Sequence, residues 1–208
     1  MTGGRLAIVG SAKLGQQLAG LAMLTGRFTI AGFFDDFAPL TDTVIGRAED
    51  IDRMFTENVF DCLAIGVGYR AMEFRHRMLT TCLDKIPLAE IICASAFADP
   101  SAEIGEGCVM LHNAVVDQRV KIGPNCFLSI AATVSHDSQV GASSYLSPRA
   151  TVCGDCMIGE RVFLGAGCVV RDGIRISDGA VVGAGAVVVK DIKKAGTYIG
   201  NPAREMEI

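Results

Sequence analysis

The chain has no hydrophobic run long enough to cross a bilayer, and no charged segment followed by an apolar one at its start. It also has no excess of positive charge, because 23 acidic residues against 19 Lys and Arg give a formal net charge of -4. Nucleic acid and anionic membrane are therefore unfavourable partners. We expect a cytoplasmic protein whose 208 residues suffice for two small domains or one long one.

A six-residue period dominates the C-terminal half. Every sixth residue from Ile104 to Val188 is aliphatic, and the residue four positions after each of these is small or β-branched. The residue directly after the aliphatic one is often Gly or Ser, which suits tight, regularly spaced corners. Two inward positions in every six residues indicate short strands, and this repeat predicts a parallel β-helix.

The cysteines are explained by the same repeat. Four of the eight occupy the small inward position, where they act as buried small hydrophobic residues: Cys108, Cys126, Cys156 and Cys168. Cys153 and Cys156 have the spacing of a metal motif, but the repeat directs Cys156 inward and Cys153 outward. The two sulfurs do not easily share one ion, so we expect no metal site.

The first ninety-odd residues have a different pattern, in which short apolar strands alternate with helices. We expect strands at residues 5–9, 29–34, 62–65 and 88–93, and helices at 16–24 and 72–83. This alternation predicts a small Rossmann-like parallel α/β domain. Pro100 and its small neighbours mark the passage to the β-helix, so we divide the chain into residues 1–97 and 98–208.

Ligands of parallel α/β sheets bind beyond the carboxyl ends of the strands, where three loops carry suitable residues. The loop 10–15 could offer backbone N–H groups to a phosphate, with Lys13 adding charge, although the middle glycine of G-x-G-x-x-G is missing. The acidic pair after the second strand could take a ribose or a base edge, or be a solvated turn. The candidate substrate-binding residues are Gly10, Ser11, Lys13, Asp35, Asp36, Gly66 and Gly68.

A basic stretch follows the third of these loops and contains Arg70, Arg75, His76 and Arg77. It could meet a pyrophosphate. A solvated helix face is the simpler interpretation, and the one that we prefer.

Segments spread over the whole chain resemble the bacterial sugar N-acetyltransferases and sialic acid O-acetyltransferases of the PglD and NeuD type. The resembling residues are 6–10 with Gly15, 33–36, 64–66, 134–137, 145–148 and 200–204. The resemblance implies a left-handed β-helix with three hexapeptides per triangular coil, so that residues eighteen apart stack in columns about 4.8 Å apart. It also implies acetyl-CoA as co-substrate and a nucleotide-linked sugar as acceptor.

His136 is the candidate general base, since it lies at a corner two residues after Val134 and is followed by Asp137. A neutral imidazole can take a proton from an attacking amine or hydroxyl, and a neighbouring carboxylate can fix its tautomer and stabilise its charged form. In the resembling enzymes a His-Glu pair has this role; here the partner is Asp. Without the resemblance, an exposed corner histidine with no role would be the simpler interpretation.

The resemblance also implies a site for the acetyl donor. Gly154 lies eighteen residues after His136 and matches the glycine whose amide faces the thioester carbonyl, a group that can hold an oxyanion. Ala166 and Ala184, on another corner column, match positions that contact the pantetheine arm, although the β-helix itself favours small corner residues. Lys190, with other basic residues near the end of the chain, and Pro202 complete the expected cofactor contacts.

Tyr145 departs from the family pattern, because a second histidine usually helps to bind the acetyl donor at this position. A phenol is a poor base at neutral pH, so His136 would carry the proton transfer alone. Nine residues, half a coil, separate the two, and they could meet only across a subunit boundary. We therefore expect a homotrimer with active sites between subunits. Lys13 and Leu14 depart from the family's glycine loop, which leaves the nucleotide open.

We predict an acetyltransferase that moves acetyl from acetyl-CoA to the amine of a nucleotide-linked amino sugar, most simply a 4-amino-4,6-dideoxy sugar for surface polysaccharide or glycan. His136 would be the base, Asp137 would orient it, and Gly154 would stabilise the oxyanion. Three alternatives stay open: a hydroxyl acceptor as in sialic acid O-acetylation, a non-catalytic binding or scaffold protein, and an acyltransferase for an amino acid. The last would leave the N-terminal loops without a nucleotide.

Overall fold

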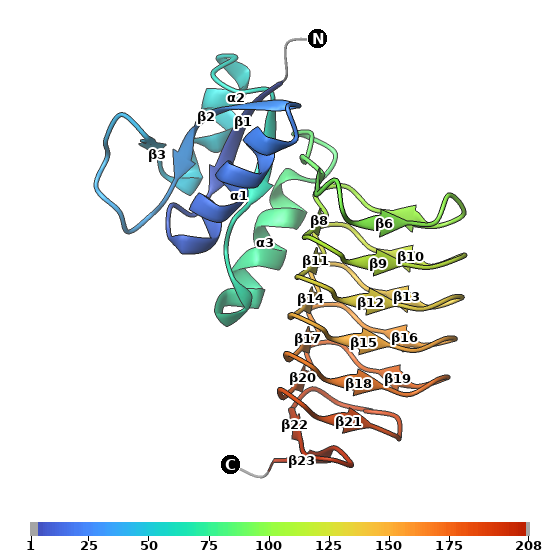
Figure 1. The fold of residues 1–208 in the computed structure, drawn as a ribbon. Coiled ribbons are helices and arrows are strands. Elements are labelled where there is room, and N and C mark those ends of the chain that lie inside the picture. The colour runs from blue at the N-terminus through green and yellow to red at the C-terminus, as the bar shows by residue number, and fades with distance from the viewer. Residues whose placement is uncertain (1–3, 207–208) are drawn as a thin grey trace. The chain divides into compact units, whose positions relative to one another are not determined.

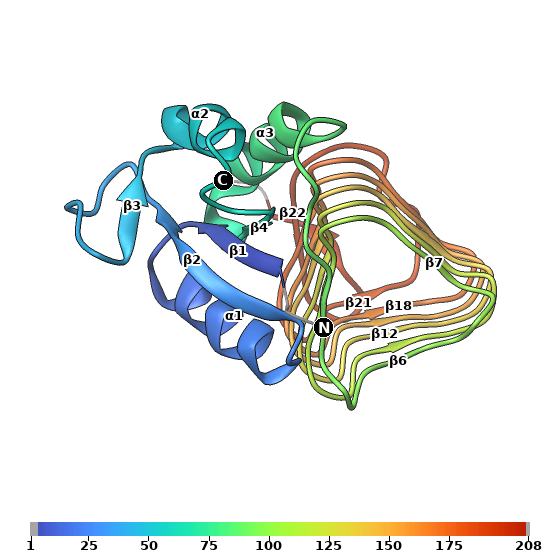
Figure 2. The ribbon, with the colours of Figure 1, turned by 90° about the horizontal axis from the view of Figure 1, so that it is seen from above.

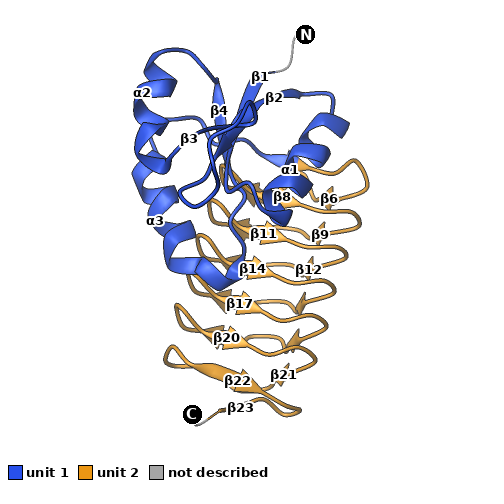
Figure 3. Ribbon diagram, turned by 90° about the vertical axis from the view of Figure 1, so that its left-hand side faces the viewer, with its two compact units in different colours: residues 1–91 blue, residues 92–208 orange. Residues whose placement is uncertain are grey.

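A computed structural model describes residues 4–206 of the chain. It divides into two compact units, residues 1–91 and 92–208 (Figure 3). The boundary after residue 91 lies upstream of the one predicted after residue 97 from Pro100 and its small neighbours. None of the helices within residues 4–206 is long and apolar enough to cross a membrane.

The first unit contains a four-stranded parallel sheet with the strand order β3-β2-β1-β4 (Figure 1; all four strands are labelled in Figure 2). Its strands are β1 Gly4–Val9, β2 Phe28–Phe34, β3 Val44–Gly46 and β4 Cys62–Ile65. Its helices are α1 Lys13–Leu24, α2 Ile51–Thr56 and α3 Met72–Cys82, with short 3-10 turns at Ala48–Asp50 and Tyr69–Ala71.

The apolar runs of this unit explain its layers. Residues 6–9 of the central strand β1 are all buried, as expected for a strand covered on both faces. Helix α1 turns a stripe that includes Leu18 and Ala22 inward. Gly15 lets this helix begin directly beside the end of β1, because an added Cβ would lie 1.8 Å from the carbonyl oxygen of Gly10.

Three of the four predicted strands and both predicted helices of this unit are present. The strand predicted at residues 88–93 is wrong: Leu88 makes only an isolated bridge to Leu63, and Ile91–Ile92 is β5, which belongs to a sheet of the second unit. Strand β3 and helix α2 have three and six residues, too few for a period to be visible in the sequence.

The second unit is a left-handed parallel β-helix made of three sheets, seen from above in Figure 2 as triangular coils. Face 1 contains β7 Glu103–Ile104, β10 Lys121–Ile122, β13 Gln139–Val140, β16 Met157–Ile158 and β19 Arg175–Ile176. Face 2 contains β5 Ile91–Ile92, β8 Val109–Met110, β11 Phe127–Leu128, β14 Tyr145–Leu146, β17 Phe163–Leu164, β20 Val181–Val182, β22 Thr197–Ile199 and β23 Arg204–Glu205. Face 3 contains β6 Phe97–Ala98, β9 Val115–Val116, β12 Thr133–Val134, β15 Thr151–Val152, β18 Val169–Val170 and β21 Val187–Val188.

The register confirms the predicted columns, since residues eighteen apart pair in neighbouring strands, as Thr133 does with Thr151. The fifteen predicted hexapeptides would fill five coils, and face 1 has five strands. Face 3 has a sixth strand, β6, in which Ala98 continues the phase upstream of Ile104. Alanine is not one of the large aliphatic residues that mark the repeat, so this coil is hidden in the sequence.

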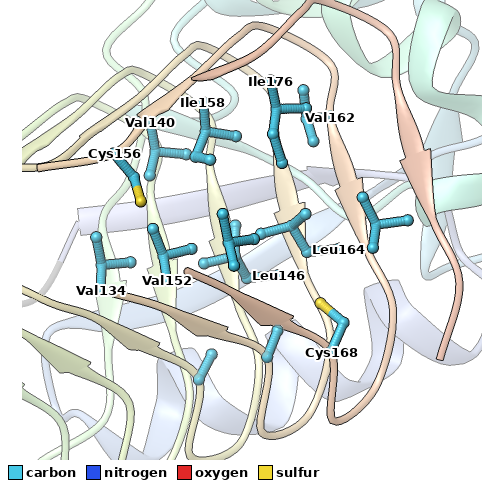
Figure 4. Packing of buried hydrophobic residues seen from close by; sticks show 14 of the residues in the cluster. Val134, Val140, Leu146, Val152, Cys156, Ile158, Val162, Leu164, Cys168 and Ile176 are labelled. Carbon is cyan, nitrogen blue, oxygen red and sulfur yellow. The ribbon is translucent and has the colours of Figure 1, made fainter. Parts of the chain in front are cut away.

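The aliphatic and the small positions both fill the interior of the coils. Val134, Leu146 and Val152 are fully buried and lie beside the small inward residues (Figure 4). Cys156 is buried and Cys153 is partly exposed, which agrees with the predicted phase. Within residues 4–206, no group of three or more His, Cys, Asp or Glu side chains could hold a metal ion.

Candidate active site

The predicted base lies at the corner that joins β12 to β13. The backbone turns there through Asp137, whose φ of 59° is a left-handed conformation that aspartate tolerates better than most residues. Nδ1 of His136 lies 2.9 Å from Oδ2 of Asp137. The His136 side chain is 51% exposed, so its imidazole is open to a substrate.

The charges at this corner favour a basic imidazole. Hydrogen bonds from Arg119 and from His136 lower the pKa of Asp137 to about 2, so its carboxylate is ionised. The hydrogen bond to Asp137, with the charges of Asp137, Asp155 and Asp117, raises the pKa of His136 although partial burial opposes the rise. When the ring is neutral, Nδ1–H faces the carboxylate, and Nε2 is left as the proton acceptor.

The His136 imidazole packs directly against Gly154. A Cβ added to this glycine would lie 2.6 Å from Cε1 and 2.8 Å from Nε2 of His136, closer than real contacts allow. The sequence predicted that the two residues share a column. The structure brings His136, Asp137 and Gly154 together and adds a steric reason for the glycine.

The amide of Gly154 is not free in this chain, because it donates a hydrogen bond of 3.0 Å to Oδ1 of Asp172 in the next coil. A similar bond joins the amide of Glu160 to Asp178, so this contact also serves the stacking of the coils. An oxyanion could use the Gly154 amide only if the Asp172 side chain turned away. Asp172 was missed in the sequence, although it stands eighteen residues after Gly154.

Tyr145 lies on face 2, within a ladder of aromatic rings eighteen residues apart. Its ring stacks on Phe127 with centroids 4.5 Å apart and an interplanar angle of 5°, and Phe163 follows at 6.0 Å. The contacts with Phe127 and Phe163 hold the Tyr145 ring on this face.

The other residues predicted to contact the cofactor are exposed. Ala166 and Ala184 lie one above the other at the corner after face 2, and the amide of Gly185 bonds to the carbonyl of Ala166. Lys190 is exposed after β21, and Pro202 is exposed in the turn between β22 and β23. Within one chain, Tyr145, Ala166, Ala184 and Pro202 belong to a different side of the triangle from the corner of His136, whereas Lys190 lies in the same corner column as His136, three coils further on.

A cavity of about 410 Å³ lies at the carboxyl ends of β1, β2 and β4 in the first unit. Five of the seven predicted substrate-binding residues line it: Gly10, Asp35, Asp36, Gly66 and Gly68. Ser11 and Lys13 are not among the lining residues. The lining that sequence reasoning missed is apolar and includes Phe34, Phe37 and Phe74, of which Phe37 is 99% exposed.

The two acidic residues of the cavity have different surroundings. Oδ2 of Asp35 accepts hydrogen bonds from the amide and the hydroxyl of Ser11, and Oδ1 accepts from the amides of Phe37 and Ala38. These bonds lower the pKa of Asp35 to about 2 and tie two loops together. One oxygen of Asp36 accepts from the Ala48 amide. Asp35 therefore organises the loops, and Asp36 is the better placed to bind a ligand.

The prediction of a solvated basic helix face is wrong for Arg75. Its side chain is fully buried, and Nη1 donates hydrogen bonds of 2.9 Å and 3.1 Å to the carbonyls of Ile65 and Val67. Arg75 therefore holds the loop that carries Gly66 and Gly68. The helical period contained this signal, because Arg75 lies on the same stripe as the buried Met78 and Leu79. Arg70 and Arg77, by contrast, are exposed.

A larger groove of about 880 Å³ runs along face 1 of the second unit. The glycine column that includes Gly105, Gly123, Gly141 and Gly159 forms part of its lining. Lys193, one of the basic residues near the end of the chain that could meet the cofactor's phosphates, lines this groove, whereas His136, Asp137 and Gly154 do not.

Two family models match within the second unit. The model described as bacterial transferase hexapeptide (six repeats) matches residues 137–172, and the model described as hexapeptide repeat of succinyl-transferase matches residues 156–190. No match was found among curated protein sequences.

Solved structures are similar over almost the whole chain. The acetyltransferase domain of PglB from Neisseria gonorrhoeae FA1090 is 31% identical, with a TM-score of 0.89 over 97% of this chain and 99% of that chain. Another structure of that domain, in complex with acetyl coenzyme A, is 30% identical over 97% and 98% of the two chains, with a TM-score of 0.89. PerB from Caulobacter crescentus, in complex with CoA and GDP-perosamine, is 26% identical over 98% of both chains, with a TM-score of 0.90.

Proposed function

Since this chain belongs to the hexapeptide-repeat sugar acetyltransferases, we propose that it transfers acetyl from acetyl-CoA to the amino group of a nucleotide-linked amino sugar. The acceptor in this proposal is a 4-amino-4,6-dideoxy sugar. The observation that carries it is the His136–Asp137 pair seated on Gly154. The similar structures that contain acetyl coenzyme A, or CoA with GDP-perosamine, support this choice of substrates.

The transfer proceeds directly from thioester to amine in this proposal. The sugar nitrogen attacks the thioester carbonyl carbon, and Nε2 of His136 takes the proton that the nitrogen loses as the N–C bond forms. Asp137 stabilises the imidazolium. The C–S bond then breaks, the carbonyl re-forms, and the proton on His136 passes to the CoA thiolate. The Gly154 amide serves the oxyanion once Asp172 has turned away.

The acetyl donor occupies the outer surface of the β-helix in this proposal, where Tyr145, Ala166, Ala184, Lys190 and Pro202 bind it. Small exposed side chains at Ala166 and Ala184 leave room for the pantetheine arm. His136 and Tyr145 lie on separate sides of one triangular coil, so we propose that a homotrimer completes each site with residues from two subunits. Light scattering coupled to size exclusion tests this part, and a monomer that turns over would contradict it.

The nucleotide occupies the cavity of the first unit in this proposal. Gly10 and Gly68 line the cavity, where the Gly10 amide donates a hydrogen bond of 2.7 Å to the carbonyl of Phe34, and Asp36 offers a carboxylate oxygen to a ribose or a base edge. Phe37 and Phe74 offer apolar rings against which a base can stack.

The second candidate function is transfer to a sugar hydroxyl. The raised pKa of His136 favours it, since a hydroxyl acceptor depends more than an amine on a strong base. One experiment separates the two: CoA release is measured with acetyl-CoA and a panel of UDP-, dTDP- and GDP-linked 4-amino sugars and their 4-hydroxy counterparts. The product is then treated with hydroxylamine, which cleaves an ester and spares an amide.

We expect turnover of one 4-amino sugar to a product that survives hydroxylamine. A cleavable product from a hydroxyl sugar would replace N-acetylation by O-acetylation. If no sugar is turned over and titration calorimetry detects no binding of acetyl-CoA by the folded protein, the chain is a binding or scaffold protein.

A further inference from the structure

Arg119 lies eighteen residues before Asp137, at the same corner of the preceding coil, and has no role in the proposed reaction. Its Nε donates a hydrogen bond of 2.6 Å to Oδ1 of Asp137, and its Nη2 donates one of 2.8 Å to Oδ2. Oδ2 is also the oxygen that lies 2.9 Å from Nδ1 of His136. One carboxylate therefore joins the guanidinium to the imidazole.

The backbone of Arg119 is held by the coil that precedes it. The Arg119 amide donates a hydrogen bond of 3.0 Å to the hydroxyl of Ser101, and this hydroxyl donates one of 2.6 Å to Oδ1 of Asp99. Arg119 also has a left-handed φ of 55°, as does Asp137 at 59°. The two residues thus have the same backbone conformation at stacked positions, and the Arg119 side chain extends along the column to the Asp137 carboxylate.

An exposed ion pair usually contributes little to stability, and the Arg119 and Asp137 side chains are 58% and 34% exposed. The geometry here has another consequence. A bidentate guanidinium fixes the plane of a carboxylate, whereas a single hydrogen bond leaves the carboxylate free to rotate. With both oxygens held by Arg119, Oδ2 stays directed at Nδ1 of His136.

We propose that Arg119 is a positioning residue, which acts on catalysis only by holding the Asp137 carboxylate against the His136 imidazole. This inference rests on the proposed function of His136 as the base. When Arg119 is lost, Asp137 rotates into water, the imidazole loses its partner, and the ring leaves its seat on Gly154. Three carboxylates, Asp117, Asp137 and Asp155, and the Arg119 guanidinium are the charges that act at this corner.

The direct charge effect of Arg119 on the imidazole is the smaller one. Arg119 faces His136 across the carboxylate, and both side chains are about half exposed, so water and salt screen their repulsion. Loss of Arg119 would raise the pKa of His136 if charge dominated, and lower it if positioning dominates. The two mechanisms therefore differ in sign.

The test compares Arg119→Gln, Asp137→Asn and the double variant with the parent. The pKa of His136 is measured by NMR titration of histidine labelled with carbon-13 in the ring; the chain has only three histidines, which single substitutions assign. We expect Arg119→Gln to move this pKa downward, toward the ordinary 6.5. We expect no further movement when the substitution is added to Asp137→Asn.

Kinetics give the second readout. Arg119→Gln should lower kcat by about tenfold with little change in either KM, because positioning acts on the proton transfer. Lysine has a single point of contact with the carboxylate, so kcat of Arg119→Lys should lie between that of the parent and that of Arg119→Gln. Lys121→Gln is the matched control: it removes an exposed cation two residues away, which pairs with Glu103 at 3.0 Å and does not touch Asp137.

A His136 pKa that stays the same or rises in Arg119→Gln would overturn the proposal, as would a tenfold loss of kcat that persists in the Asp137→Asn background. Thermal melts show whether a variant is folded. If the parent turns over no sugar, the proposed function fails, but the NMR titration still decides whether Arg119 positions Asp137.

Discussion

The packing of the His136 imidazole against Gly154 can be tested by replacing Gly154 with Ala. The added Cβ would lie 2.6 Å from Cε1 of His136, so the ring must move until the contact reaches at least 3.4 Å, a shift of about 0.8 Å. A displacement of about 1 Å in a reacting group costs on the order of 10²-fold in rate. We therefore expect kcat/KM to fall about 10²-fold, which corresponds to about 2.7 kcal/mol of transition-state stabilisation.

The fold should survive this change. Gly154 is not among the glycines with positive φ, and the His136 ring can turn toward solvent because it is half exposed. Gly154 is buried beneath the His136 ring, and movement of that ring relieves the contact, so we expect the free energy of unfolding to change by less than about 1 kcal/mol.

The assay is release of the CoA thiol at saturating acetyl-CoA, together with a thermal melt. Gly20→Ala is the control: a Cβ there meets nothing within 4 Å in helix α1, so activity should equal that of the parent. A well-folded Gly154→Ala with kcat/KM within about threefold of the parent would refute the idea that the position of the imidazole limits the rate.

Four further substitutions give separate tests. Asp137→Asn should move the acidic limb of the pH–rate profile to lower pH, because Asp137 raises the pKa of His136, the base acts only when neutral, and activity is lost as pH falls through that pKa; a limb that stays in place would contradict this. Phe37→Ala should weaken nucleotide binding about tenfold in titration calorimetry while acetyl-CoA binding is unchanged; equal loss of both would point to unfolding. Tyr145→Phe keeps the ring stack, so the melting temperature should hold while KM for acetyl-CoA rises; an unchanged KM would remove the hydroxyl from the site. Asp172→Ala should leave kcat equal to or above that of the parent because it frees the Gly154 amide; a tenfold fall would show that the carboxylate itself takes part.

The β-helix was predictable because every coil has the same packing requirement. Each coil must bury the same two positions, so the sequence shows one phase from Ile104 to Val188, and the pairing of residues eighteen apart follows from it. The coil that contains Ala98 was hidden because a small residue fills its aliphatic position. The α/β unit was harder to predict, since β3 and α2 have only three and six residues, too few for a hydrophobic period to be visible in the sequence.

The candidate site was predictable as a column and not as a set of contacts. The spacing of eighteen placed His136 beside Gly154, and the same arithmetic connects Arg119 to Asp137 and Gly154 to Asp172. Which of these side chains bond depends on rotamers, which no periodicity encodes. Arg75 shows the opposite case, because its burial could be read from the helical stripe that includes Met78.

The central claim is that His136 takes the proton from a sugar amine as acetyl leaves CoA. The most direct measurement is turnover of the accepted amino sugar by the parent, by His136→Asn and by His112→Asn. His112 is an exposed corner histidine of the β-helix whose Nδ1 lies 3.1 Å from the Ser95 hydroxyl. We predict that His136→Asn loses at least about 10²-fold in kcat while the His112 variant equals the parent. Equal turnover by the parent and a folded His136→Asn would show that another group is the base.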